Sequence, residues 1–387
     1  MTEVKRTMAK TEKHVHEPLI HIVKRIAGMP AWQAWLIRIA SVAAALLVCA
    51  VVTVLLTGEN PLGVYKTMVE GAIGTERRVW NLLQNIAMLL CVSLAVTPAF
   101  RMRFWNIGAE GQVLIGGLAT ASCMLLLGNK LPTPLLFVVM IAASVVAGAV
   151  WGLIPAFFKA NWNTNETLFT LMMNYVALQL VKFIIAYRDV KYPWSANGTV
   201  VGIFNSDQKL GSYQVGWFPE VGGSRYLLPI ILIAVLTIVL YLYLKYSKHG
   251  YEIAVVGESE RTARYAGIKV ERVIVRTMVL SGAICGLIGF MLVGTDRTLT
   301  DTLVDGRGYT AVMVSWMAKF NPIGMVFAAF LLVFMQLGAK EVASLPSLNL
   351  NHSFADILTG IILFFIIGCE FFISYKLQLS RHKKQGV

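Results

Sequence analysis

Apolar residues occur along this chain in long stretches that are separated by shorter polar segments. A transmembrane helix needs roughly 20 mostly apolar residues, and the pattern predicts about ten membrane segments. In chain order they are Leu36–Leu56, Leu82–Ala99, Ile107–Leu127, Leu135–Phe158, Thr167–Tyr187, Tyr226–Tyr246, Val273–Val293, Tyr309–Phe320, Ile323–Ala339 and Phe354–Tyr375. The eighth is too short to span and lies between Gly308 and Asn321-Pro322, which favours a broken or re-entrant helix. We therefore expect an all-α, polytopic membrane protein.

The composition supports this expectation. Hydrophobic residues make up 57% of the chain and charged residues only 14%, whereas soluble domains are nearer 45–50% apolar and about 25% charged. A disordered chain, a coiled coil and an ordinary soluble enzyme are excluded. The predicted organisation is a basic N-terminal segment (1–35), a transmembrane domain (36–375) and a basic tail (376–387), with an external loop at 188–225 and a cytoplasmic loop at 248–271.

The charge excess then becomes a signal of topology. The chain has 34 Lys and Arg against 21 Asp and Glu, a net charge of +13. In a soluble protein this excess would suggest nucleic-acid binding. Positive residues of membrane proteins gather in cytoplasmic segments, and here they gather in the N-terminal segment, in Lys245–Arg276 and in the tail. We expect both termini to be cytoplasmic.

Motifs of catalysis and metal binding are absent from the sequence. The five cysteines lie in apolar stretches, with no C-x-x-C spacing, and they are interpreted as small hydrophobic residues. The sequence has no G-x-x-x-x-G-K-[ST] phosphate loop and no H-E-x-x-H motif. We expect no catalytic residue, no metal site and no cofactor in this chain.

A first polar motif joins a basic loop to an apolar segment, and it contains Asn106, Gly108, Glu110 and Gln112. Polar groups inside a bilayer are costly and usually face a bundle interior or a water-filled path. The motif is therefore either a broken helix that lines a translocation path or a helix start with a carboxylate in its first turn. These residues alone favour neither interpretation.

A second motif predicts a short helix within the loop 248–271. Ser259 is a suitable N-cap, Glu260 suits the first turn, and Gly267 is a suitable C-terminal stop. Such a helix either docks on a soluble partner or lies on anionic headgroups with the help of Arg261 and Arg264. The sequence alone slightly favours the second alternative.

The remaining candidates for a transport path are isolated polar and aromatic residues. Gly306–Gly324 holds glycines, Pro322 and Trp316, and a segment interrupted in this way can mark a transport path. An aromatic belt at the membrane interface is the alternative for Trp316. Asn85 and Asn174 lie inside apolar segments, where contact between helices is about as plausible as contact with cargo.

Together these motifs resemble the permease subunits of ABC importers in the branched-chain amino acid/ribose superfamily, and most of all the nucleoside importer group that works with a binding lipoprotein. The resemblance rests on Phe104–Gln112, where Trp105 is inserted into the family pattern, on Asn165-Glu-Thr and Leu171-Met-Met-Asn-Tyr175, on Gly257–Ile268, and on Gly306-Arg-Gly-Tyr309 with Asn321-Pro-Ile-Gly324. It covers about residues 36–375.

The resemblance implies a type II importer fold in a bacterial inner membrane. The implied partners are a cytoplasmic ATPase that binds ATP and Mg, a second and usually different permease chain, and an extracytoplasmic binding lipoprotein. The implied cargo is a nucleoside, most plausibly a purine nucleoside. Residues implied to couple to the ATPase are Gly257, Glu258, Ser259, Arg261, Ala263, Arg264, Tyr265, Ala266 and Gly267. Hypothetical path residues are Asn85, Asn106, Gly108, Glu110, Gln112, Asn174 and Trp316, with Glu110 expected to hold the broken helix together rather than to bind cargo.

Two alternatives remain open. The same class of permease could carry a sugar such as ribose or a branched-chain amino acid. An ion-coupled secondary transporter is less favoured, because it predicts charged pairs in the middle of the membrane, and the sequence pattern indicates almost none.

Overall fold

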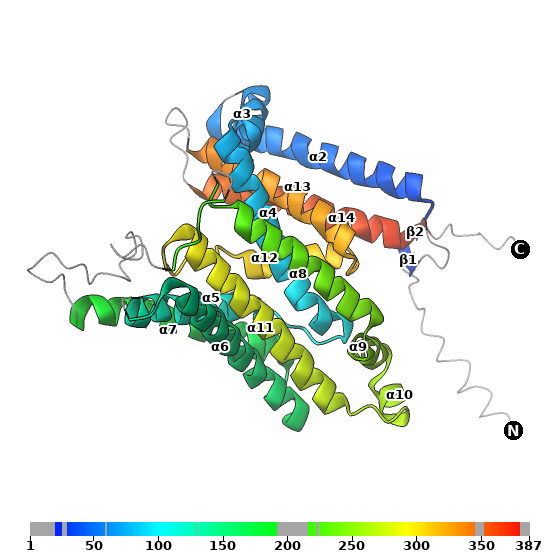
Figure 1. The fold of residues 1–387 in the computed structure, drawn as a ribbon. Helices are drawn as coiled ribbons and strands as arrows, with labels where there is room; N and C mark the ends of the chain where they lie inside the picture. Colours follow the sequence, from blue (N-terminus) through cyan, green and yellow to red (C-terminus); the bar gives the residue numbers. More distant parts are fainter. Residues whose placement is uncertain are drawn as a thin grey trace, which may run out of the picture. The chain divides into compact units, whose positions relative to one another are not determined.

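The computed structural model describes residues 20–24, 29–58, 60–128, 130–191, 216–221, 224–344 and 352–379. The chain forms two compact units, one made of residues 1–65 with 345–387 and the other of Lys66–Ser344. The elements of the first are β1 (Ile20–Lys24), α2 (Ala31–Thr57), α14 (His352–Ser374) and β2 (Tyr375–Leu379), and α3 (Pro61–Ile73) crosses the boundary. The second holds α4 (Glu76–Arg101), α5 (Ala109–Leu127), α6 (Thr133–Trp162), α7 (Glu166–Lys191), α8 (Leu227–Tyr246), α9 (Lys248–Glu258), α10 (Glu260–Tyr265), α11 (Val270–Asp296), α12 (Arg307–Met317) and α13 (Pro322–Ala343) (Figure 1).

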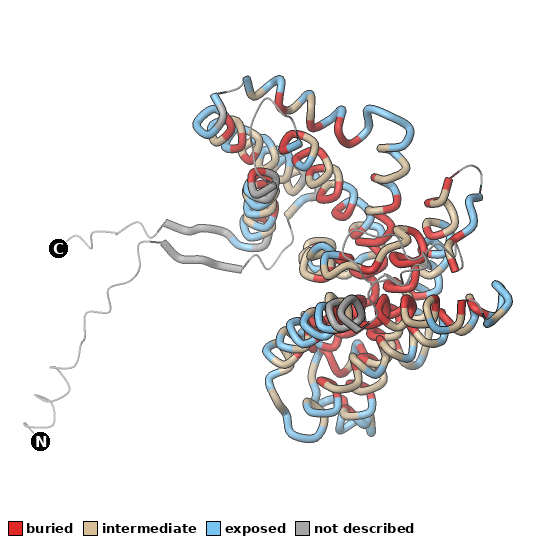
Figure 2. The backbone as a smooth tube through the Cα atoms, turned by 90° about the vertical axis from the view of Figure 1, so that its left-hand side faces the viewer, coloured by how far each residue is buried: buried red, intermediate tan, exposed pale blue. Residues whose placement is uncertain are grey.

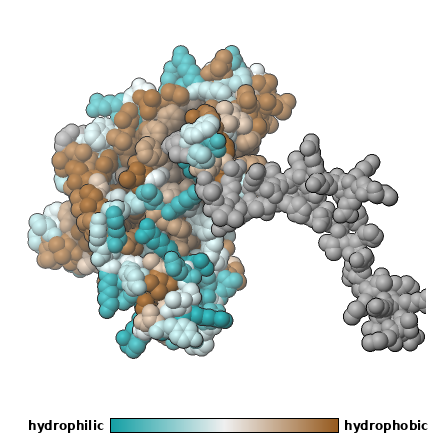
Figure 3. All heavy atoms as spheres, turned by 90° about the vertical axis from the view of Figure 1, so that its right-hand side faces the viewer, coloured by the Kyte–Doolittle hydropathy of each residue, from teal (hydrophilic) through white to brown (hydrophobic). Residues whose placement is uncertain are grey.

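Helices dominate, so the all-α, polytopic class is confirmed. Within the described residues, 8 helices are long and apolar enough to cross a membrane, and α14 carries a shorter apolar stretch, Ile357–Ile373. Each of the ten predicted segments corresponds to a helix, and the eighth, α12, has only 11 residues. Exposed apolar side chains cover much of the surface in Figure 3, as lipid contact requires.

Four elements were not predicted. Helix α3 buries Val64, Met68 and Ala72, four residues apart, but Lys66 and Glu70 interrupt its apolar pattern. Helix α9 occupies the start of the segment predicted as a loop, where the Ser247 hydroxyl accepts a hydrogen bond from the Gly250 N–H. Strands β1 and β2 pair antiparallel, with Ile20 opposite Leu379. Both strands lie in segments predicted only as basic tails.

The larger unit has its core where α5, α6 and α11 meet. The most deeply buried spans are α4 and α11, and the tube in Figure 2 shows buried residues gathered in the interior of the unit. Close approach depends on glycine: a Cβ on Gly286 would lie 2.0 Å from the Ser144 carbonyl oxygen. Small residues allow helix backbones to approach closely in membranes, and this contact holds α6 against α11.

The smaller unit pairs α2 with α14. Arg38 donates to Glu370 at 2.6 Å, and the Ser41 hydroxyl donates to the Phe365 carbonyl at 2.6 Å. These contacts give polar groups of two apolar helices partners inside the unit. The predicted external loop 188–225 and the predicted tails lie largely outside the described residues.

Candidate functional site

The first polar motif forms a break between α4 and α5. Residues 102–108 are non-helical, and Arg103 takes a φ of 60°, which is uncommon for a residue with a side chain. Asn106 is fully buried, donates to the Ser281 hydroxyl at 3.0 Å and accepts from the Gly108 N–H at 3.1 Å. The Asn106 side chain therefore fixes the break against α11.

Side chains of helix α7 form hydrogen bonds to backbone groups of the break and of the start of α5. The Asn174 amide oxygen accepts from the Gly111 N–H at 2.9 Å, while its nitrogen donates to the Ile107 carbonyl at 2.8 Å and to the Tyr309 hydroxyl at 3.3 Å. The Thr170 hydroxyl accepts from the Ile107 N–H at 3.2 Å. Free backbone groups in a membrane must be satisfied inside the protein, and α7 does this for the start of α5.

Glu110 connects α5 to the start of α12. Its carboxylate accepts hydrogen bonds from the backbone N–H of Gly306 at 3.0 Å and of Gly308 at 2.7 Å. Gly306 takes a φ of 71°, in the left-handed region that glycine adopts without strain. A helix N-terminus carries free N–H donors and a partial positive charge, both of which favour a carboxylate. Glu110 thus stabilises the N-terminus of the short helix.

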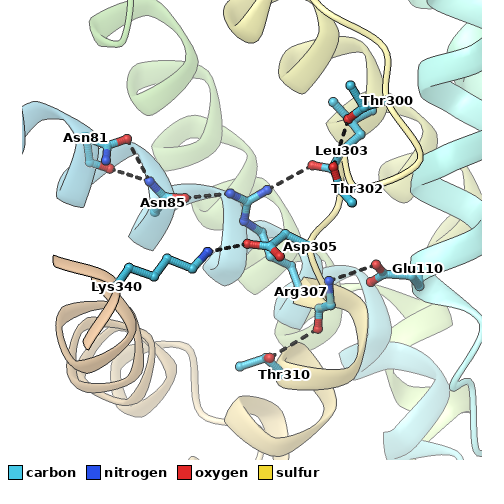
Figure 4. Close-up of polar contacts among 11 residues, drawn as sticks. Asn81, Asn85, Glu110, Thr300, Thr302, Leu303, Asp305, Arg307, Thr310 and Lys340 are labelled. Carbon is cyan, nitrogen blue, oxygen red and sulfur yellow. Dashed lines mark hydrogen bonds and ion pairs between the residues drawn. The ribbon is translucent and has the colours of Figure 1, made fainter. Parts of the chain in front are cut away.

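Charged side chains from neighbouring elements converge on the same place (Figure 4). Arg307 donates to the Asn85 amide oxygen at 2.6 Å and to the Leu303 carbonyl at 3.2 Å. Lys340 of α13 donates to Asp305 at 2.6 Å. A cavity of about 30 Å³ lies among these groups, which is room for about two waters. We call this set, Asn85, Glu110, Asp305, Arg307 and Lys340, the α12 junction.

Asp296 extends the junction toward the end of α11. Its carboxylate accepts a hydrogen bond from Gln84 and interacts electrostatically with Arg307 and Arg225. Glu110, Asp296 and Lys340 each lie within the first or last turn of a candidate span. Sequence reasoning missed Asp296, Asp305 and Lys340 as site residues. The one available signal was the Gly306-Arg-Gly motif around Arg307.

The remaining path candidates are placed separately. Gln112 is buried, its amide nitrogen donates to Asn106 at 3.4 Å, and its amide oxygen has no partner among the described residues. Gly108 is buried at the break. Trp316 lies outside the α12 junction, half exposed, with its ring 4.8 Å from that of Trp105. The structure brings Asn106, Glu110, Gln112 and Asn174 together through the break and leaves Trp316 in an aromatic cluster.

The short helix of the second motif is α10. The Ser259 hydroxyl accepts from the Thr262 N–H at 3.2 Å, and Gly267 follows with a φ of 77°. Both ends lie where the sequence predicted them. Ala263 is buried, whereas Tyr265 is 93% exposed. Exposed coupling candidates on and beside α10 are Glu258, Arg261, Arg264, Tyr265, Ala266 and Gly267.

Helix α9 attaches α10 to the break. A Cβ on Gly257 would lie 1.9 Å from the Arg101 carbonyl oxygen, so α9 crosses the end of α4 in direct contact. Ala263 and Ile253 share one apolar cluster with Met102 and Phe104. Arg276 of α11 donates to Glu252 of α9 at 2.8 Å, and this hydrogen bond lowers the pKa of the Glu252 carboxyl. The helix pair therefore packs on the residues at which the break begins.

Comparison with known proteins identifies the family. Residues 78–367 match the model of the permease component of branched-chain amino acid transport systems. The chain belongs to this family. It is a multi-pass membrane protein of the ABC importer permease class, whose members are transport subunits that act with an ATPase and a binding protein.

Similar permeases carry different solutes. The chain is 26% identical over 362 residues to the glucose ABC transporter permease protein TsgB13 of Haloferax volcanii, covering 91% of this chain and 92% of the relative. It is 27% identical over 339 residues to the guanosine permease NupP of Bacillus subtilis, covering 86% and 92%. The nucleoside permease NupB of Lactococcus lactis is 26% identical over 328 residues, covering 84% and 88%.

Proposed function

We propose that this permease moves nucleosides, purine nucleosides above all, inward by alternating access, driven by ATP hydrolysis on the partner ATPase. The cargo assignment is supported by similarity to a guanosine permease and a nucleoside permease over more than four fifths of the chain. The second candidate cargo is a sugar, supported by similarity to the glucose permease.

The observation that carries the mechanism is the contact of α9 with the break. In this proposal, α10 docks on the ATPase through Arg261, Arg264 and Tyr265. Because Gly257 lies directly on the Arg101 carbonyl, a displacement of α10 and α9 reaches the end of α4. Beyond the break, Glu110 holds the start of α12. The motion of the ATPase thus reaches α12 through one series of contacts.

The polar side chains at the break act as positioning groups in this proposal. The amides of Asn106 and Asn174 fix the broken helix through hydrogen bonds to Ser281 and to the Ile107 carbonyl, while the Asn85 amide bonds to Asn81 within α4. All of these bonds have to open or exchange before the amides can contact an uncharged, polar cargo.

The proposed orientation places α10 and both termini in the cytoplasm, in an inner membrane. Its support is the positive charge around α9 and α10. In a chain whose five natural cysteines are replaced by serine or alanine, a single cysteine introduced at exposed Tyr265 should react with a membrane-impermeant maleimide only in inside-out vesicles. Reaction in right-side-out vesicles would reverse the orientation.

Uptake by the complete importer tests the cargo. Proteoliposomes that contain this chain, its partner permease, the ATPase and the binding protein are supplied with labelled guanosine, ribose, glucose or leucine. ATP-dependent accumulation of guanosine alone supports the nucleoside assignment, whereas accumulation of a sugar or leucine without guanosine refutes it. Omission of this chain is the control and should abolish uptake.

A further inference from the structure

Four aromatic rings meet where α4 and α12 end, in the larger unit. The Phe100 ring centre lies 5.9 Å from that of Trp105 and 6.4 Å from that of Phe320. The Trp316 ring centre lies 4.8 Å from that of Trp105 and 6.3 Å from that of Phe320. Phe100 is buried, whereas Trp105 and Trp316 are partly exposed. The cluster is therefore anchored inside the protein and open at its two tryptophans.

Basic residues flank the aromatic cluster in both parts of the chain. Arg101 is the last residue of α4 and donates to the Phe320 carbonyl at 3.0 Å, which ties the end of α4 to the turn between α12 and α13. Arg103 lies in the break and Lys319 lies in that turn, and both side chains are exposed. We call this set, Arg101, Arg103, Trp105, Trp316, Lys319 and Phe320, the basic aromatic patch.

Both exposed cations stand on constrained backbone. Arg103 and Lys319 take φ values of 60° and 49°, and Phe320 takes 60°. Residues with side chains rarely occupy this left-handed region. Where they do, surrounding contacts hold them there, and such residues cluster at functional sites. Because Arg101 holds the Phe320 carbonyl, the turn that carries Lys319 is fixed against the end of α4.

The patch carries three positive charges and no acidic residue. Within the described residues, the Arg103 side chain forms no hydrogen bond or ion pair. The acidic residues of α9, which packs on the end of α4, do not neutralise it. Glu252 bonds to Arg276 at 2.8 Å, and Glu258 is exposed and forms no ion pair with any described residue. The patch therefore has donors to offer to an anion.

The patch lies at the same end of the spanning helices as α10. Gly257 of α9 packs directly on the Arg101 carbonyl, and α10 follows α9 after one residue. If α10 faces the cytoplasm, as the proposed function states, the patch belongs to the cytoplasmic surface of the bilayer. Tryptophan and basic side chains at this depth lie among lipid headgroups.

Apolar side chains continue the patch toward the membrane interior. Helix α13 begins at Pro322, soon after Lys319, and Ile323 and Phe327 in its first turns are 71% and 68% exposed. These two residues are four positions apart and therefore lie on one face of the helix. A surface that is basic at headgroup level and apolar below it matches a single phospholipid with a negative headgroup.

We propose that the basic aromatic patch binds an anionic phospholipid of the cytoplasmic leaflet, with its phosphate at Arg103 and Lys319 and its acyl chains on α13. The inference rests on the proposed function for the choice of leaflet. Charge-assisted hydrogen bonds from arginine and lysine to phosphate are strong, and basic sites between spanning helices bind anionic headgroups. Because α9 packs on the end of α4 beside the patch, the bound lipid should also support coupling.

Lipid binding measured by native mass spectrometry tests this site. The complete importer, purified in detergent, is titrated with phosphatidylglycerol or with phosphatidylcholine, which has no net charge. The patch variant carries Arg103→Asn and Lys319→Asn, since asparagine tolerates the left-handed backbone. The control variant carries Lys248→Gln and Arg272→Gln, which remove the same two charges from exposed positions outside the patch.

We expect the natural importer to bind phosphatidylglycerol in preference to phosphatidylcholine. The patch variant should bind phosphatidylglycerol about thirtyfold more weakly, the effect of removing two basic groups near an anionic surface, while the control variant should bind it like the natural chain. In proteoliposomes, phosphatidylglycerol should raise the ATP hydrolysis that the binding protein stimulates in the natural importer and not in the patch variant.

Unchanged binding of phosphatidylglycerol to the patch variant overturns the proposal, as does an equal loss in the control variant. Displacement of the lipid by inorganic phosphate would assign the patch to a soluble anion instead. Loss of the ATPase from the purified patch variant, at unchanged lipid affinity, would assign it to that interface. Equal stimulation by phosphatidylglycerol in the natural importer and the patch variant would remove the effect on coupling. Lipid binding is measured without cargo or ATP, so failure of the nucleoside assignment leaves this test intact.

Discussion

The Glu110 carboxylate accepts a hydrogen bond from the Gly308 N–H at 2.7 Å, although the two residues are 198 positions apart. This bond, with its companion to Gly306, joins the helix after the break to the start of α12. A buried N–H that loses its partner costs about 1–3 kcal/mol, so the bond matters for assembly as well as for position.

Substitution of Glu110 separates these roles. Glu110→Ala removes both acceptors and should lower assembly and thermal stability, whereas Glu110→Gln keeps one acceptor oxygen and should retain assembly and most uptake. Yield and Tm of the purified complex, with guanosine uptake, measure this. An assembled but inactive Glu110→Gln variant would show instead that the charge acts directly in transport.

The contact of α6 with α11 predicts a sharp steric effect. Gly286→Ala places a Cβ 2.0 Å from the Ser144 carbonyl oxygen, and overpacking of this kind costs about 1–3 kcal/mol. The Tm should fall by several degrees. Gly360→Ala in α14 is the control, because its Cβ would meet nothing within 4 Å, and its Tm should stay equal or rise. A Gly286→Ala variant as stable as the natural chain would contradict the tight packing.

The Glu252–Arg276 bond predicts an effect of pH. Because the hydrogen bond from Arg276 holds the pKa of the Glu252 carboxyl in the folded chain below its ordinary value, its stabilisation is complete above the unfolded pKa and is lost as pH falls through the folded pKa. The Tm should therefore decline more steeply between about pH 5 and about pH 3 in the natural chain than in Glu252→Gln. Parallel curves would show that the bond contributes nothing.

Substitution of Tyr265 should weaken coupling to the ATPase without destabilising the fold. Its side chain is 93% exposed, so Tyr265→Ala should leave the Tm unchanged while weakening ATPase binding and stimulation. Tyr251→Ala on α9 is the matched control, since this tyrosine is 66% exposed, and it should retain both. Equal behaviour of the two variants in pull-down and ATPase assays would remove Tyr265 from the docking surface.

Asp296 predicts an effect on the response to the binding protein. It interacts electrostatically with Arg225, just before α8, and with Arg307 at the α12 junction. Asp296→Asn removes this shared charge and should reduce the stimulation of ATP hydrolysis by the loaded binding protein. Stimulation equal to that of the natural importer would show that the two places act independently.

Local signals made part of the fold predictable. Ser259 and Gly267 mark the two ends of α10 because capping depends on neighbouring residues. The apolar stretches likewise located each of the 8 candidate spanning helices among the described residues. In contrast, α3 has an amphipathic pattern with charges at Lys66 and Glu70, and a search for continuous apolar segments passes over it.

The rest depends on contacts between distant residues. Arg307 meets Asn85 across 222 positions and Glu110 meets Gly306 across 196. The spacing of residues in a single sequence does not predict contacts between such distant pairs. The motif Asn106–Gln112 could therefore be marked as unusual, but its attachment to α7, α11 and α12 required the folded chain.

The pairing of α2 with α14 has a consequence for biogenesis. Arg38 and Glu370 are 332 residues apart, and at a synthesis rate of about 5–20 residues per second the ribosome needs on the order of tens of seconds to travel between them. Helix α2 thus enters the bilayer long before its partner α14 exists. Strands β1 and β2 can likewise pair only after Leu379 has been synthesised. A nascent chain released before α14 is made leaves Arg38 and Ser41 of α2 without their partners on that helix.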